Sequence, residues 1–166
     1  MSATPQMAVY RQPLHGKDES VDHAALKPVI EGTIPWVRDS GLQAELLEER
    51  HVLLRLPKDR HLNHVGIVYA GSLFMLMEVS GAALFGCTYA PGKYIPINRE
   101  MSIRFLRMGV TDITCELSLA EERAAEMIRP IDEKGKGEWV LEMDCRDTEG
   151  NVIATSVCHY YIKKIE

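Results

Sequence analysis

Hydrophobic and polar residues alternate along three segments in the C-terminal half of the chain. The alternation runs through residues 101–105, 112–120 and 138–147. A period of two places successive side chains on opposite faces of a strand, so each segment predicts a β-strand with one buried and one wet face. A Gly-Asn turn in residues 147–151 leads into the β-rich run 152–163, which predicts an antiparallel hairpin with the strand before it.

A different pattern fills the chain between His64 and Lys93, where 28 consecutive residues carry one charged side chain, Glu78. Apolar residues surround the whole circumference of a helix in residues 73–85, which is typical of a helix buried on all sides. The stretch is long enough to cross a membrane, but a central carboxylate would cost about 3 kcal/mol there. We therefore predict an α+β fold in which a curved antiparallel sheet wraps around a long central helix.

The N-terminal half is less regular. Residues 24–37 predict short helical turns, interrupted at Gly32 and Pro35 and ended near Gly41. Residues 42–57 combine β-compatible residues with charges and end at a proline. They predict one strand, although their leucines and glutamates also suit a helix.

Two further segments complete the predicted organisation. Residues 121–128 predict a short helix that Pro130 ends. Residues 1–23 contain prolines and a glycine without periodicity, and they predict a loosely ordered arm. Residues 24–166 then form a single domain, because a chain of this length can bury one sizeable core.

Composition narrows the class of protein. The chain is 46% hydrophobic and 26% charged with a net charge of −5, which is typical of a globular protein and argues against a nucleic-acid or membrane partner. The four cysteines show no zinc-ligand spacing and predict buried free thiols, and no metal site is expected. Residues 1–20 lack the pattern of a signal peptide, so the expected location is the cytoplasm.

Glu78 is the candidate for chemistry, because a carboxylate in an apolar helix pays a desolvation cost unless something pairs with it or it reaches a cleft. Either it is a structural group, protonated or hydrogen-bonded, or it is functional. The loop before the helix contains Asn63 and Gly66, and the first turn falls near Gly71. Free N–H groups at a helix start stabilise developing negative charge, so the Gly71 N–H could form an oxyanion hole.

The segment "NHVGIVYAGSLFMLME" resembles the signature of the phenylacetate-pathway (PaaI-like) hotdog-fold thioesterases. Asn63, Gly66, Gly71 and Glu78 fall in register with it. Tyr69 stands where that family has histidine, and Ala70 replaces the first glycine of the pair. The Tyr-Ala-Gly variant is similar to a hotdog branch that includes thioesterase domains of the YiiD C-terminal type.

The resemblance implies an acyl-CoA thioesterase that releases a carboxylic acid and a free thiol, with its active site at the interface of a homodimer or a dimer of dimers. Asn63 and the Gly71 N–H of one subunit would face Glu78 of the other. Glu78 would act as a general base or as a nucleophile, and Asn63 would orient water or the thioester. The implied substrate carries coenzyme A or an acyl carrier protein, and no separate cofactor is implied.

Further residues could contact such a substrate. Tyr69, Ala70, Gly66 and His64 would lie near the thioester, although a loop histidine also suits a solvent-facing role. Arg104 and Arg107, together with Arg99, follow the helix and could bind coenzyme A phosphates, because guanidinium groups match phosphate oxygens. The methionines of "FMLME" and Met101 suit either an acyl pocket or the core.

Three other functions remain open. A non-catalytic acyl-CoA or fatty-acyl binding module would keep the pocket without turnover, and Tyr69 and Ala70 favour it. A hotdog dehydratase or hydratase would need a catalytic histidine with an acidic partner, which His64 does not provide. A purely structural dimer would leave Glu78 without any role, so its replacement by leucine would leave folding intact or improve it.

Overall fold

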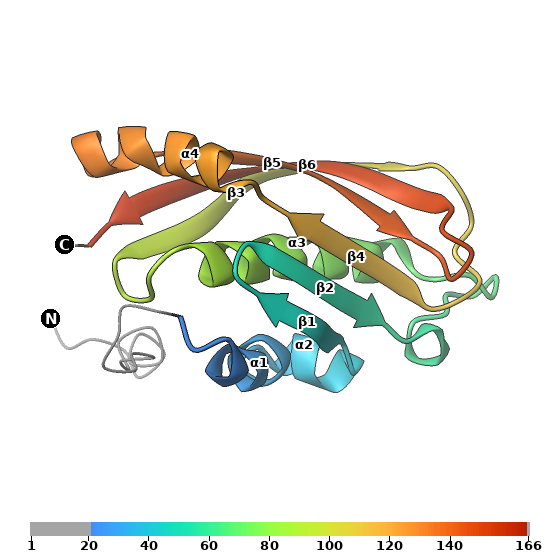
Figure 1. Cartoon of the computed structure of the whole chain (residues 1–166). Coiled ribbons are helices and arrows are strands. Elements are labelled where there is room, and N and C mark those ends of the chain that lie inside the picture. Colours follow the sequence, from blue (N-terminus) through green and yellow to red (C-terminus); the bar gives the residue numbers. More distant parts are fainter. Residues whose placement is uncertain (1–20, 166) are drawn as a thin grey trace, which may run out of the picture.

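A computed structural model describes residues 21–165 of the chain. A long apolar helix, α3 (Ala70–Thr88), lies against a six-stranded antiparallel sheet (Figure 1). The strands are β1 (Gln43–Glu48), β2 (His51–Leu56), β3 (Tyr94–Phe105), β4 (Ile113–Ser118), β5 (Lys136–Arg146) and β6 (Val152–Lys164). Their order across the sheet is β1-β2-β4-β5-β6-β3. The predicted α+β architecture is therefore confirmed.

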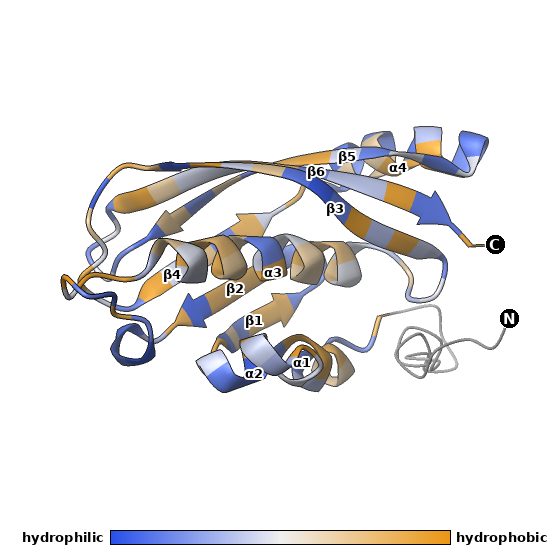
Figure 2. Ribbon diagram, turned by 180° about the vertical axis from the view of Figure 1, so that it is seen from behind, coloured by the Kyte–Doolittle hydropathy of each residue, from blue (hydrophilic) through white to orange (hydrophobic). Residues whose placement is uncertain are grey.

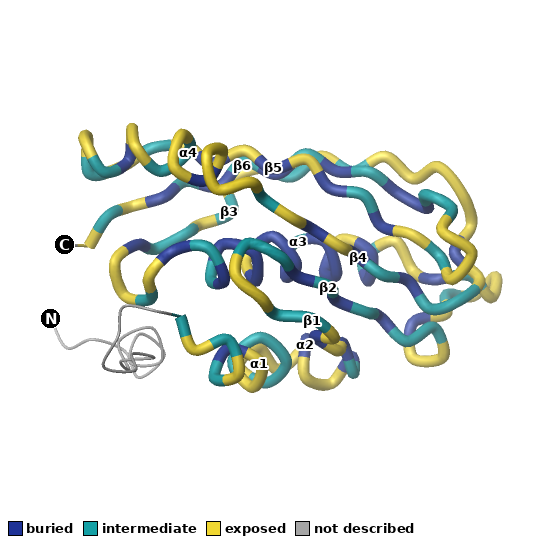
Figure 3. Tube along the Cα trace, viewed as in Figure 1, coloured by how far each residue is buried: buried dark blue, intermediate teal, exposed yellow. Residues whose placement is uncertain are grey.

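The sheet curls around α3, so that β1 and β2 lie on one side of the helix and β5 and β6 on the other (Figure 1). Figure 2 shows α3 mostly apolar, and Figure 3 shows it as the most continuously buried element. This helix is long and apolar enough to span a membrane, but 67% of its apolar window is buried within the fold. The burial confirms a core helix that is apolar on every side because protein surrounds it.

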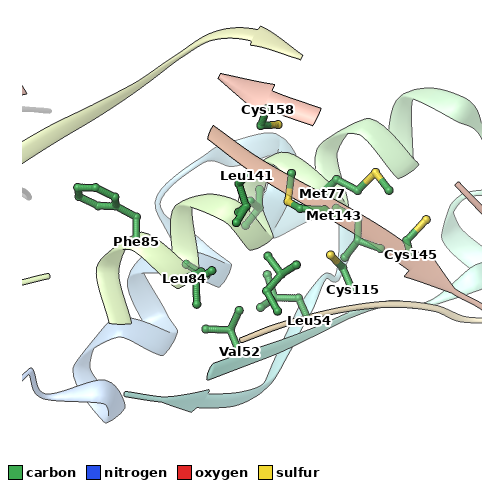
Figure 4. Close-up of a cluster of buried hydrophobic side chains, with 14 of the residues drawn as sticks. Val52, Leu54, Met77, Leu84, Phe85, Cys115, Leu141, Met143, Cys145 and Cys158 are labelled. Carbon is green, nitrogen blue, oxygen red and sulfur yellow. The ribbon is translucent and has the colours of Figure 1, made fainter. Parts of the chain in front are cut away.

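The core between α3 and the sheet is built from the inward faces of the strands (Figure 4). Val52 and Leu54 of β2 and Leu141 of β5 face Met77 and Leu84 of the helix. The predicted hairpin forms between β5 and β6. All four cysteines (Cys87, Cys115, Cys145 and Cys158) are free and buried, as predicted. Burial raises the pKa of the Cys115 thiol to about 12, so it stays protonated at neutral pH.

Two local predictions were wrong. Residues 42–57 form the hairpin of β1 and β2 rather than one strand, because Arg50 adopts a left-handed turn with φ 58°. Its N–H donates to the Cys87 carbonyl (3.2 Å) and its carbonyl accepts from the Leu119 N–H (2.9 Å). The other error concerns α4 (Glu121–Lys134), which continues through Pro130.

Packing explains the length of α4. Ala124 and Ile131 are seven residues apart, which places them on one face of the helix, and both are buried. Burial of Ile131 beyond the proline outweighs the lost backbone hydrogen bond, and the helix ends at Gly135 with φ 73°.

The N-terminal region forms two short helices, α1 (His23–Gly32) and α2 (Pro35–Ser40), followed by a left-handed Gly41. These match the predicted interruptions and the predicted end. A single turn of 3-10 helix, η2 (Lys58–Arg60), follows β2. Most of the predicted arm at residues 1–23 lies outside the described residues, so the arm stays a prediction.

Strand β3 lies at one edge of the sheet and pairs only with β6 among the described strands. It contains Pro96, which lacks a backbone N–H and therefore suits an edge. Its inward face, directed toward α3, includes Asn98, Met101 and Phe105, which pair with inward-facing positions of β6 across a bulge. This edge leaves one flank of α3 open.

Candidate active site along the central helix

Two cavities open on the flank of α3 that faces β3. The first, the Glu78 cavity, has a volume of about 460 Å³. It is lined by Ile34, Trp36, Val37, Phe74, Met75, Glu78, Val79, Asn98, Arg99, Glu100 and Met101. The second, the Asn63 cavity, has about 390 Å³ and is lined by Asn63, Ile67, Val68, Ala70, Leu73, Phe105, Leu106, Arg107, Met108 and Gly109. Glu78 thus lines one cavity, and Asn63 and Ala70 line the other. Gly66, Tyr69 and Gly71 line neither of these two cavities.

Glu78 is half-buried in the middle of α3 and contributes to the wall of its cavity. Its carboxylate has no hydrogen bond or ion pair with any residue from 21 to 165. Burial among apolar neighbours raises the pKa of Glu78 above its ordinary value of 4.5. Of the two structural explanations, hydrogen bonding therefore finds no support in the described part of the chain, and the carboxylate is available to a ligand in the cavity.

Asn63 organises the loop before α3. Its side-chain Oδ1 accepts hydrogen bonds from the N–H groups of Val65 (3.0 Å) and Ile67 (3.3 Å). The N–H of Gly66 donates to the Asn63 carbonyl (3.0 Å), and Gly66 has φ 80°, so a glycine suits this turn. The side-chain oxygen holds the loop, Asn63 lines the Asn63 cavity, and its Nδ2 makes no hydrogen bond within residues 21–165.

The start of α3 presents the predicted donor. Tyr69 is the N-cap residue, and its carbonyl accepts from the N–H groups of Ser72 (2.9 Å) and Leu73 (3.2 Å). No side chain caps this helix within the described chain, so the Gly71 N–H lacks a partner there. The phenol ring of Tyr69 occupies the space where a Gly71 Cβ would stand. Tyr69 is 55% exposed, so more than half of this side chain faces solvent.

A buried histidine that the sequence did not single out connects these elements. His61 Nε2 lies 3.0 Å from the Ser40 carbonyl at the end of α2, and His61 Nδ1 lies 2.9 Å from Ser72 Oγ in the first turn of α3. A carbonyl only accepts, so Nε2 carries the proton and Nδ1 accepts from the Ser72 hydroxyl. Burial lowers the pKa of His61 and favours this neutral form. Both side chains are buried, which makes the pair a structural connection rather than a nucleophile and its base.

The structure separates the remaining predicted residues. Ala70 and Arg107 join Asn63 around the same cavity. His64 lies exposed in the loop, as the solvent-facing alternative expects. Arg104 lies on the opposite face of the sheet, in a polar hollow with Glu142 and other outward-facing side chains. Arg99 lines the Glu78 cavity. Of the three arginines predicted to bind phosphate, only Arg107 lines the cavity beside the loop and the start of α3.

Spacing along α3 limits what one chain can do. Gly71 and Glu78 are seven residues apart, which places them on the same helix face but about 10 Å apart along the axis at 1.5 Å per residue. A carbonyl bound at the Gly71 N–H therefore lies far from the Glu78 carboxylate of the same chain. The Gly71 N–H and the Glu78 carboxylate can act on the same carbon atom only if they come from two different chains or if the chain rearranges.

Comparison with known proteins supplies the family and the fold. Residues 23–162 match the model of a family described as a domain of unknown function (DUF4442). No curated protein matches the chain. A crystal structure of a protein of unknown function from Pseudomonas aeruginosa, described as a probable thioesterase, is 36% identical and superposes with a TM-score of 0.82, covering 87% of this chain and 97% of that one.

Two more distant structures share the architecture. A thioesterase from Haemophilus influenzae is 14% identical with a TM-score of 0.64, covering 87% of this chain and 92% of that one. A hypothetical thioesterase from Streptococcus pneumoniae, solved with coenzyme A, is 16% identical with a TM-score of 0.56, covering 75% of this chain and 87% of that one. At this level of identity these two structures support the fold alone.

Proposed function

We propose that this chain, which belongs to the DUF4442 family and has the hotdog fold of the thioesterase superfamily, is a thioesterase that hydrolyses an acyl-CoA. The single observation that carries the proposal is the desolvated Glu78 carboxylate in the wall of a cavity, which has no partner among residues 21–165. A raised pKa makes the ionised carboxylate a stronger base than an ordinary glutamate. The 36% identical relative, itself described as a probable thioesterase, supports the same reaction class.

A homodimer would assemble the site. The free edge of β3 offers backbone donors and acceptors for a second β3, and a two-fold axis there would make the two α3 helices run antiparallel. Large apolar side chains are exposed on this side of the molecule, including Phe74 (41%), Phe105 (51%) and Met108 (71%). Antiparallel helices would bring the start of one α3 toward Glu78 of the other, which removes the separation found within one chain.

The proposed reaction uses three groups. The Gly71 N–H at the start of α3 would donate to the thioester carbonyl and stabilise the oxyanion. Glu78 of the partner subunit would take a proton from water, which attacks the carbonyl carbon. The C–S bond then breaks, and Glu78 gives this proton to the departing thiolate, which releases a carboxylic acid and a thiol. Glu78 could instead attack the carbonyl carbon, so that the C–S bond breaks, the thiolate leaves and an anhydride forms. Water would then open the anhydride to the carboxylic acid and protonated Glu78, which gives its proton to the thiolate. Asn63 Nδ2 would orient the water or the thioester.

Arg107 supports coenzyme A as the carrier, because this residue lines the Asn63 cavity and a guanidinium group matches phosphate geometry. The structure from Streptococcus pneumoniae, solved with coenzyme A, is consistent with this carrier. We place the reaction in the cytoplasm, where four free thiols would persist in reduced form. No additional cofactor is required by these steps.

A non-catalytic acyl-CoA binding module is the second candidate. The observation that favours it is the Tyr69 ring, which fills the space beside Gly71 where a thioester carbonyl would approach. In such a module, the cavities would still hold an acyl group, but the oxyanion position would stay covered.

Thiol release from short, medium, long and aromatic acyl-CoAs tests the proposal. The native protein is compared with Glu78→Gln, which keeps the shape and removes the base, and with Glu100→Gln, which changes an exposed carboxylate lining the same cavity. We expect turnover that falls by about 100-fold or more in Glu78→Gln and is retained in Glu100→Gln. Turnover unchanged in Glu78→Gln would contradict the proposal, and binding without turnover would favour the binding module.

A further inference from the structure

One wall of the Glu78 cavity belongs neither to α3 nor to β3 but to the region of α2. Ile34 and Trp36 of the α2 region line it and are 51% and 56% exposed, whereas the adjacent Val37 is buried at 2%. An exposed tryptophan beside an exposed isoleucine at the rim of a cavity is a feature of binding surfaces rather than of ordinary protein surface. This wall needs an occupant that matches its chemistry.

The position of Trp36 is fixed by its surroundings. Pro35 begins α2, and the left-handed Gly41 ends it. At the end of this helix the Ser40 carbonyl is bound to His61, which also contacts Ser72 of α3. His61 therefore links the helix that carries Trp36 to the helix that carries Glu78.

The remaining lining is mainly hydrocarbon. Phe74 and Met75 lie about one turn before Glu78 on α3, Val79 follows it, and Met101 faces the cavity from β3. Methionine side chains adapt to flexible hydrocarbon chains. Two carboxylates, Glu78 and Glu100, line the cavity. They would repel an acyl group that itself carries a negative charge.

Arg99, the cationic member of this lining, is engaged elsewhere. Its guanidinium lies over the Tyr161 ring at 5.7 Å from the centroid. The volume of about 460 Å³ is toward the small end of the range of ligand pockets, which suits a medium-length chain better than a long one. The chemistry of the cavity thus matches an uncharged hydrocarbon of limited length.

We propose that the Glu78 cavity binds the hydrocarbon part of an uncharged, medium-length acyl group, and that Trp36 sets the length of chain accepted. This inference rests on the proposed thioesterase function, because it names the acyl group presented to Glu78. Each methylene placed in an apolar cavity increases affinity by about 4-fold, so a pocket of fixed depth gives a steep dependence on chain length that stops where the cavity ends.

Tryptophan fluorescence provides a readout that does not depend on turnover. The chain has two tryptophans, of which Trp139 is fully buried and Trp36 is exposed. A hydrocarbon chain beside Trp36 should shift its emission to shorter wavelength. The probes are non-hydrolysable S-alkyl-CoA thioethers with butyl, octyl and hexadecyl chains, titrated into the native protein and into Trp36→Phe, which should lose most of the spectral shift.

Chain-length preference is then measured calorimetrically for the native protein, for Trp36→Ala and for Val140→Ala. Val140 is 37% exposed on the outer face of the sheet, so its variant controls for loss of an exposed apolar side chain. We expect affinity to rise by about 4-fold per methylene from butyl to octyl and then level off. Trp36→Ala should extend the rise toward hexadecyl, whereas Val140→Ala should keep the native profile.

Two results would overturn the inference. One is an affinity that does not depend on chain length, and the other is an unchanged length profile in a folded Trp36→Ala variant. Failure of the hydrolysis proposal is distinguishable, because thioether binding with the expected profile but without turnover of acyl-CoAs would keep the acyl cavity and reject only catalysis. Turnover of acyl-CoAs with a chain-length profile that Trp36→Ala does not change would keep catalysis and reject the role of Trp36.

Discussion

Replacing Glu78 by glutamine should make the protein more stable at neutral pH while it removes activity. The carboxylate is half-buried, and within residues 21–165 no hydrogen bond or ion pair compensates its desolvation. An uncompensated buried polar group costs about 1–3 kcal/mol, and partial exposure places Glu78 at the lower end, near about 1 kcal/mol. For a chain of 166 residues that corresponds to an increase in Tm of about 2–4 °C.

The gain in stability from Glu78→Gln should increase with pH, because the native protein loses stability as Glu78 ionises. Burial raises the pKa of Glu78 above 4.5, so between the unfolded and folded pKa values the folded state binds more protons than the unfolded state. Stability therefore falls as pH rises through this window, and the loss is complete above the folded pKa. Glutamine does not titrate, so the advantage of Glu78→Gln should be present at about pH 8 and small at about pH 4.

Thermal and chemical denaturation of the native protein and Glu78→Gln at these two pH values measures the difference. Glu100→Gln is the matched control, because Glu100 is exposed and its replacement should change Tm little. A Glu78→Gln variant that is less stable than the native protein at pH 8 would refute the reasoning, since it would mean that the carboxylate has a stabilising partner. A gain in stability together with lost activity identifies a group retained for function.

Three further predictions concern the supports of the site. Gly81→Ala should lower stability by about 1–3 kcal/mol in thermal denaturation, because its Cβ would overlap the buried Tyr160 hydroxyl, whereas Gly86→Ala has room and should be neutral or stabilising. His61→Gln should flatten the loss of stability as pH falls below about 6.5, since burial lowers the pKa of His61 and the unfolded chain then takes up more protons; an unchanged slope in denaturation would contradict this. Asn63→Asp keeps the oxygen that holds the loop but removes the Nδ2 donor, so kcat for acyl-CoA hydrolysis should fall by about 10-fold or more with Tm nearly unchanged.

Periodicity predicted the elements whose environment is uniform along their length. The strands β4, β5 and β6 each have one face on the core, so a period of two is visible in their sequence. Helix α3 is surrounded by protein, and its continuous apolar run follows from that. Glu78 stood out because it breaks this run, and the motif around Asn63 and Gly71 gave the site its register.

Long-range contacts determined what the sequence did not predict. The turn at Arg50 contains no glycine or asparagine, and it is held by backbone groups of Cys87 and Leu119, which are distant in the chain. The role of His61 depends on Ser40 and Ser72, which approach it only in the folded protein. Trp36 lies within the predicted helical turns of residues 24–37, and only the fold places it at the cavity that contains Glu78.

Complementation between two variants of impaired activity tests most directly whether the catalytic groups come from two subunits. Glu78→Gln and Asn63→Asp are co-expressed with different affinity tags, and the mixed dimer is isolated by tandem purification. Such a dimer would contain one site with both native groups and one with neither, so about half of the native activity per dimer should return. Activity no greater than that of either parent variant, in a verified mixed dimer, would contradict a site shared between subunits.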